Sequence, residues 1–135
     1  MLAIAQRKAD EKSIDNITFA QSAIEDFSVA DQSFGVVMGH SILHLVENKE
    51  MVISRVHNLL EPGGIFVGST VCMASANKIV KIILPIGIFL GLLPLVKFFS
   101  AKQLTDSIVD AGFEIEYQWQ PGEDRAVFIV AKKAG

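Results

Sequence analysis

An α/β fold is predicted for this chain, because helix-type and strand-type segments alternate along it. Two short apolar runs, FGVVM at residues 34–38 and IFVGSTV at residues 65–71, have the length and composition of buried parallel strands. A helical pattern between them ends in Glu-Pro-Gly-Gly, which is the helix-to-strand step of a βαβ unit. The 135 residues are half apolar, so a single domain over residues 1–135 is expected.

The segment before the first apolar run is predicted to hold one helix and one short strand. Residues 2–12 are rich in good helix formers and place a leucine and two alanines on one face. Asp15-Asn16 suits a turn, and the apolar and β-branched residues 17–19 suit the start of a strand. Residues 22–33 are mixed and polar, so a loop is expected there.

The clearest helix signal covers residues 47–60, where apolar side chains recur with helical spacing. This apolar stripe consists of Val52, Ile53, Val56, Leu59 and Leu60. Pro62 cannot continue the helix, and the two glycines after it allow a sharp turn into the strand at residues 65–71. His57 falls on the polar side of the helix, so it is predicted to face solvent.

The C-terminal part predicts a capped helix followed by a hairpin. Ser100 and Gln103 match a capping box at the start of the helix, and Gly112 suits the position just after its end. Residues 113–119 alternate between apolar and polar, as in a half-exposed strand, whereas residues 126–131 are almost all apolar. The short turn between these segments predicts that they pair antiparallel.

The charge pattern argues against a nucleic-acid partner. The net charge is -3, and the 12 Lys and Arg residues are scattered rather than clustered as a phosphate-tracking groove requires. Cys72 is the only cysteine, which excludes an internal disulfide and fits a reducing, cytoplasmic setting.

Residues 73–99 are predicted to form an apolar lid or insertion. Their uncharged part, residues 82–96, is shorter than the roughly 20 residues of a bilayer-spanning helix, and it contains prolines and glycines. Three interpretations stay open. The segment lines a site for an apolar acceptor, it packs against the fold or another subunit, or residues 79–99 contact a membrane surface.

Three stretches, taken in order, carry a family resemblance. Residues 19–37, FAQSAIEDFSVADQSFGVV, look like a third strand, an adenine-binding loop and the start of a fourth strand. Residues 40–64 end in SRVHNLLEPGG, similar to the helix and turn that follow that strand. Residues 104–132 resemble a final helix and hairpin. Together they resemble class I S-adenosylmethionine-dependent methyltransferases of the ubiquinone and menaquinone methyltransferase type.

The resemblance implies a Rossmann-like sheet with strand order 3-2-1-4-5-7-6, of which this chain would be the C-terminal two-thirds. The family's glycine-rich cofactor loop has no counterpart, because no Gly-x-Gly occurs in the sequence. We therefore expect an N-terminally truncated sheet that lacks its middle strands. Either the strands on the two sides of the gap pair directly, or another chain, such as the second copy of a homodimer, covers the exposed apolar edge.

The implied cofactor is S-adenosylmethionine, and the implied reaction is methyl transfer to a small-molecule acceptor. Two groups of residues match the family's cofactor site, one in the adenine loop and one after the fourth strand. They are Ser22, Ala23, Ile24 and Glu25, followed by Gly39, His40 and Ser41. Many relatives carry aspartate at the position of Ala23, so the side-chain contact to adenine is weakened there.

His40 is the candidate general base, because the pKa of histidine lies near neutrality. The alternative is a packed or solvent-facing histidine. Methyl transfer of this kind depends mainly on holding the reactants in line, so a base is optional. The spacing of His40, His44 and Glu47 would suit a metal on one helix face, but no HExxH and no third His or Cys lies nearby. No metal site is predicted.

Two functional hypotheses follow. The chain is part of a methyltransferase, inactive alone if the missing loop prevents cofactor binding, or it is a non-catalytic scaffold or partner subunit. The absent glycine loop, and the absent acid that would bind the ribose hydroxyls, favour the second hypothesis.

Overall fold

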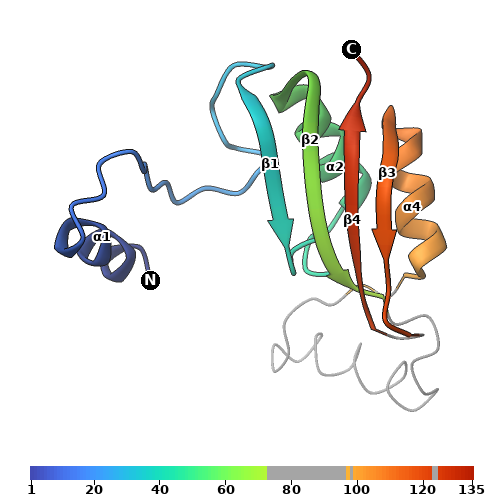
Figure 1. Cartoon of the computed structure of the whole chain (residues 1–135), viewed down its shortest axis with the longest axis horizontal. Coiled ribbons are helices and arrows are strands. Elements are labelled where there is room, and N and C mark those ends of the chain that lie inside the picture. The colour runs from blue at the N-terminus through green and yellow to red at the C-terminus, as the bar shows by residue number, and fades with distance from the viewer. Residues whose placement is uncertain (73–96, 98, 123–124) are drawn as a thin grey trace.

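The computed structural model describes residues 1–72, 97, 99–122 and 125–135. It contains a four-stranded sheet, two helices against one face of that sheet, and a third helix that stands apart (Figure 1). In chain order the elements are α1 (Leu2–Glu11), β1 (Phe34–His40), α2 (Lys49–Leu59), β2 (Leu60–Val71), α4 (Ala101–Asp110), β3 (Phe113–Trp119) and β4 (Ala126–Lys133).

The sheet has the strand order β1-β2-β4-β3, with β1 at one edge. β1 and β2 pair in parallel, whereas β4 pairs antiparallel with both β2 and β3. The α/β fold and the C-terminal antiparallel hairpin are therefore confirmed. The order also agrees with the 4-5-7-6 half of the sheet that the resemblance implies.

α2 begins and ends for local reasons that the sequence contains. The side chain of Asn48 accepts a hydrogen bond from the backbone N–H of Met51 and caps the first turn. The helix ends at Leu59, and the chain is extended from Leu60 onwards. β2 therefore begins earlier than the predicted residue 65, and the Pro-Gly-Gly turn lies inside it, with Gly63 at φ 78°.

The main core lies between the sheet and the two helices α2 and α4. α4 has the predicted capping box, since Ser100 and Gln103 each bond the backbone N–H of the other. Gly112 follows the helix with φ 95°, in the left-handed region that suits glycine. The largest fully buried side chains are Phe66, Ile53, Leu59, Leu60, Leu104, Ile108, Ile129 and Val127.

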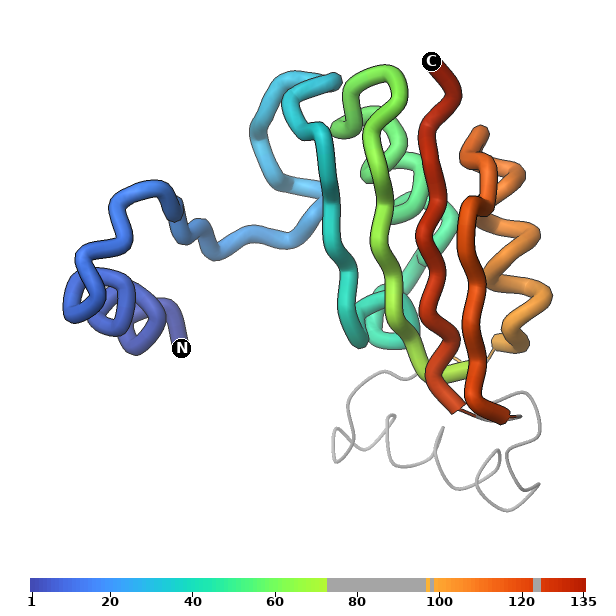
Figure 2. The backbone as a smooth tube through the Cα atoms, viewed as in Figure 1, coloured from blue at the N-terminus to red at the C-terminus, as the bar shows by residue number. Residues whose placement is uncertain are grey.

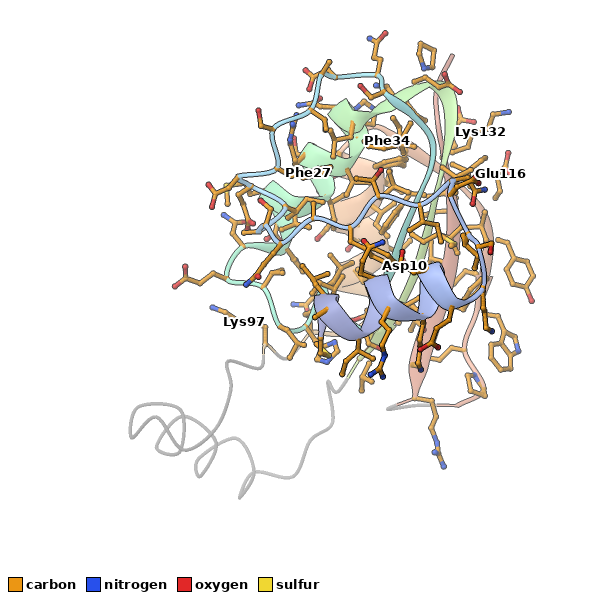
Figure 3. The ribbon with its side chains drawn as sticks, turned by 90° about the vertical axis from the view of Figure 1, so that its left-hand side faces the viewer. Asp10, Phe27, Phe34, Lys97, Glu116 and Lys132 are labelled. Carbon is orange, nitrogen blue, oxygen red and sulfur yellow. The ribbon has the colours of Figure 1, made fainter. Side chains whose placement is uncertain are left out.

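The opposite face of the sheet carries no helix among the described residues. On β2 and β4 the side chains alternate between buried and half-buried, so the half-buried ones form this open face. They include Ile65, Val67, Val71, Phe128 and Val130. Glu116 and Lys132 project from the same side, away from the helices (Figure 3). Most sheets with parallel strands are covered on both faces, so this apolar surface is unusual.

The N-terminal segment extends beyond β1 as an arm. α1 lies on the far side of the free edge of β1, away from the sheet (Figures 1 and 2). The predicted strand at residues 17–19 is wrong, because these residues have no strand partner and are not in a strand. A strand needs a neighbour to satisfy its backbone groups, and the described sheet contains only β1, β2, β4 and β3.

The apolar residues 73–96 lie outside the described part of the chain, so the predicted lid at residues 73–99 is seen only at Lys97 and Phe99. Within the described residues, no helix combines the length and the apolar character needed to cross a membrane.

His57 does not face solvent as the sequence predicted. Its ring packs edge-on against Phe113, with 5.0 Å between the ring centroids, and Gly112 lies beside it. Burial lowers the pKa of His57, and the nearby positive charge of Lys133 lowers it further. The prediction failed because Phe113 and Lys133 are brought to His57 only by tertiary packing.

Lys133 stabilises the end of α2. Its Nζ donates to the carbonyl oxygens of His57 and Leu60, both at 2.8 Å. We expect Lys133→Met to lower the free energy of unfolding by about 1–3 kcal/mol, because two carbonyls lose a charged donor. Lys132→Met is the matched control, because Lys132 is about half exposed and makes only a 3.9 Å ion pair with Glu116. If urea unfolding showed the same loss of free energy of unfolding in both variants, this role of Lys133 would be contradicted.

The lowered pKa of His57 predicts a pH dependence of stability. The unfolded chain binds a proton at His57 near pH 6.5, whereas the folded chain does so only at lower pH. The contribution of neutral His57 to the free energy of unfolding is therefore fully present above pH 6.5. It is lost as the pH falls from 6.5 toward the lowered pKa of the folded state. His57→Gln should flatten this fall, and His40→Gln should not. Urea unfolding between about pH 7.5 and 5.5 measures how the free energy of unfolding of each variant depends on pH.

Candidate functional site

The loop at residues 22–25 and the carboxyl end of β1 share one cavity of about 230 Å³. Ile24 from the loop closes it on one side, and Gly39 and His40 of β1 line it on another. Its remaining lining is apolar and comes from β1, β2, α2 and the segment before α2. These residues are Val37, Met38, Ile42, Leu43, Val52, Ile53, Val56 and Phe66.

A second hollow, of about 420 Å³, lies on the other side of Ile24. The loop residues Ser22, Ala23, Ile24 and Glu25 form one wall of it. Phe27, Ile42 and Val46 complete the lining. Ile24 and Ile42 border both hollows, so the predicted adenine loop and the segment after β1 lie against each other in space.

β1 continues through two of the residues that were predicted to follow it. Gly39 and His40 pair with Gly68 and Ser69 of β2, so they form the end of the strand. The chain turns at Ser41, which has φ 55° and donates its backbone N–H to the carbonyl of Ser69 at 2.6 Å. Ser41 is not among the residues that line either hollow, whereas the other predicted cofactor residues line one or both.

Gly39 keeps the cavity open. A Cβ atom at this position would lie 3.4 Å from both Ile42 Cγ2 and Phe66 Cε2, which is ordinary contact distance. Alanine would therefore fit, but a longer side chain would have to enter the space that the cavity occupies. A small residue at the end of β1 suits a site that a ligand approaches closely.

The two histidines of this region have different surroundings. His40 is exposed at the end of β1, on the border of the cavity, so its role as general base stays a prediction. His44 is half-buried, and its Nδ1 lies 3.0 Å from the hydroxyl of the buried Thr70. This contact gives His44 a structural role. No group of three or more His, Cys, Asp or Glu among the described residues is placed to hold a metal.

Cys72 is not a candidate nucleophile. It is buried directly after β2, and burial raises the pKa of its thiol to about 11. The reactive thiolate is therefore scarce at neutral pH.

Sequence reasoning missed part of the site. Ile42 and Val46 were not predicted as site residues, yet they line the second hollow together with the loop. Arg55 lies outside the apolar stripe by which the helix was predicted, yet it bonds Phe27, Val29 and Asp31. The position of Ile42 and Val46 directly after a parallel strand could have indicated their role, because ligands of α/β sheets bind at the carboxyl edge of the strands.

The described residues fit one part of the implied cofactor. Apolar walls from Ile24 and Ile42 suit a flat base such as adenine. The cavity of about 230 Å³ is smaller than the roughly 300–1,000 Å³ typical of whole ligand sites. The fit is therefore to the nucleoside alone.

Comparisons with known proteins agree with this fold. A family model described as "Methyltransferase domain" matches residues 1–108. An S-adenosylmethionine-dependent methyltransferase from Mesorhizobium loti is 17% identical with a TM-score of 0.73, over 97% of this chain and 76% of that one. A methyltransferase of the same cofactor dependence from Methanosarcina mazei is 19% identical with a TM-score of 0.72, over 98% of this chain and 76% of that one.

The same fold also occurs in a protein named for a different reaction. The cyclase SpnF is 16% identical with a TM-score of 0.78, over 98% of this chain. The chain spans 62% of the length of that cyclase. At these identities the likeness concerns the fold, and one fold hosts many chemistries. The match nevertheless includes the N-terminal arm, because nearly the whole chain superposes.

The left-handed backbone at Ser41 yields a test of the turn that ends β1. We expect Ser41→Gly to raise the free energy of unfolding by a few tenths to about 1 kcal/mol, because glycine adopts positive φ without a Cβ clash. Ser41→Val should lower it by about 1–2 kcal/mol, since a β-branched side chain tolerates this region poorly. Urea unfolding measures both, and equal effects of the two substitutions would contradict the conformation.

Proposed function

The chain belongs to the methyltransferase domain family, and we propose that it carries the nucleoside half of a pocket for S-adenosylmethionine. The observation that carries this proposal is the shared lining of the cavity by Ile24 of the loop and by Gly39 and His40 of β1. These residues are far apart in sequence and meet at the carboxyl end of a parallel strand, where open α/β sheets bind ligands.

Each side of the cleft supplies a contact that adenine needs. Ile24 and Ile42 offer apolar surface to the two faces of the base. The backbone of Ala23 and the carboxylate of Glu25 lie in the same loop, where they suit the edge of the base with its amino group. Gly39 leaves room for the sugar to pass the end of β1.

The proposed reaction is methyl transfer to a small acceptor. When bound, S-adenosylmethionine supplies a methyl group activated by its sulfonium. The contribution of this chain is to hold the nucleoside against the turn after β1, so that an acceptor can meet the methyl group in line. His40 stands at that turn and would take a proton from an acceptor that releases one.

The second half of the pocket is proposed to come from polypeptide outside residues 1–135. Two observations support this. The sequence contains no Gly-x-Gly, and β1 has a free edge with Val36 54% and Met38 67% exposed. The ubiquinone and menaquinone methyltransferase type is proposed from the resemblance. An apolar acceptor is proposed because the apolar residues 73–99 would suit one. The same segment would account for contact with a membrane surface by a cytoplasmic protein.

A non-catalytic scaffold or partner subunit is the second candidate function. The absence of Gly-x-Gly favours it, because a chain without the glycine loop cannot approach the methionine part of the cofactor closely. The two functions differ in one property. A scaffold has no need of an adenosine site, whereas the methyltransferase proposal requires one.

The half-site predicts which fragments of the cofactor bind. Adenosine should shift the methyl NMR signals of Ile24 and Ile42 with a dissociation constant near 1 mM, typical of a small fragment in a shallow site. Methionine should shift neither. S-adenosylhomocysteine should bind no more than about threefold tighter than adenosine, because its amino-acid part has no partner here. The buried Ile108 in α4 is the internal control.

Two substitutions test whether the adenosine response comes from this cleft. Ile24→Asp should abolish the adenosine response, because it places a charge on the apolar wall. Val109→Asp, on the exposed surface of α4, should leave it unchanged. No response to adenosine at about 10 mM would remove the methyltransferase proposal for this chain and support the scaffold.

Where no other polypeptide covers the edge of β1, we propose that a second copy of the chain pairs with it to form a homodimer. The strand carries neither lysine nor proline, which natural edge strands use to avoid pairing with other chains. Light scattering should show a dimer at micromolar concentration. Val36→Lys should give a monomer, whereas Val109→Lys on α4 should not. A wild-type monomer at every concentration would contradict this pairing.

A further inference from the structure

We infer that Arg55 is a positioning residue for the nucleoside loop, an inference that rests on the proposed function. Arg55 lies on α2, and its side chain is 23% exposed. Its Nη1 donates to Asp31 Oδ1 at 2.6 Å, and its Nη2 donates to the carbonyl oxygens of Phe27 and Val29, both at 3.1 Å. One guanidinium therefore holds three points of the segment that directly follows residues 22–25.

Arginine has the geometry that this contact requires. Its guanidinium is planar and presents several N–H donors in a fixed fork, so it can bond three acceptors in fixed directions. A lysine in its place would carry the same charge on a single flexible nitrogen. The two bonds to carbonyl oxygens also depend on the backbone shape of residues 27–29, so they select one conformation of the segment.

Backbone hydrogen bonds extend the same attachment. Gln32 and Ser33 donate their N–H groups to the carbonyl oxygens of Asn58 and Leu59, both at 2.9 Å. The whole of residues 27–33 is thus fixed to the second half of α2. Phe27 lies on the α2 side of the molecule, apart from α1, where Asp10 is found (Figure 3).

The loop itself depends on this anchor. Its own hydrogen bonds are local, from Asp26 N–H to the carbonyl of Ala23 and from Phe27 N–H to the carbonyl of Ile24. On its other side it continues into the arm, which stands away from the sheet. The position of Ile24 against β1 is therefore set by the packing of its own side chain and by the anchor at Arg55.

The test compares Arg55→Met and Arg55→Lys with the wild-type chain. Arg55→Met should speed amide hydrogen exchange across residues 22–31 at least about tenfold and weaken adenosine binding by a similar factor, the effect of losing charge-assisted hydrogen bonds. Arg55→Lys should restore part of both, because it keeps the charge opposite Asp31. The control is Ile108→Val, which loosens the core under α4 far from the loop.

Each result has one meaning. Unchanged exchange at residues 22–31 in Arg55→Met, relative to Ile108→Val, would overturn the inference. Faster exchange with unchanged adenosine affinity would overturn it as well, because Arg55 would then hold only the polypeptide. Absence of adenosine binding by the wild-type chain would instead contradict the proposed function, and it is seen before any substitution is made.

Discussion

The parallel pairing of β1 with β2 fixes the end of β1, against which the rest of the candidate site lies. It places Gly39 and His40 at the carboxyl edge of the sheet, beside Gly68 and Ser69, and forces the chain to turn at Ser41. The segment after this turn then provides one wall of the cleft, and α2 carries the anchor for the other. Among the described residues β1 is an edge strand, with β2 as its neighbour in the sheet.

The same edge explains two features that look unrelated. The open face of the sheet has half-buried apolar side chains, and the arm with α1 stands away from the sheet. Both fit the proposal that the second half of the pocket comes from polypeptide outside residues 1–135. Nearly the whole chain matches the three solved domains described above, and it spans 62–76% of their length.

The sequence predicted those features that depend on local patterns. The α2 stripe, the Ser100–Gln103 capping box and the alternation of β3 each arise from neighbouring residues, so a single sequence contains them. Residues 17–19 were wrongly predicted as a strand, because a strand exists only with a partner. The surroundings of His57 and Arg55 were missed since they depend on contacts with Phe113 and with residues 27–31, which tertiary packing alone creates.

The central claim is that the loop at residues 22–25 and the end of β1 form one cleft. Methyl–methyl nuclear Overhauser effects in the free chain test this most directly, because they require side chains within a few ångströms of each other. We expect cross-peaks from Ile24 to Val37 and to Ile42, because all three line the same cavity. A spectrum in which Ile24 shows contacts only to its own sequence neighbours would contradict it.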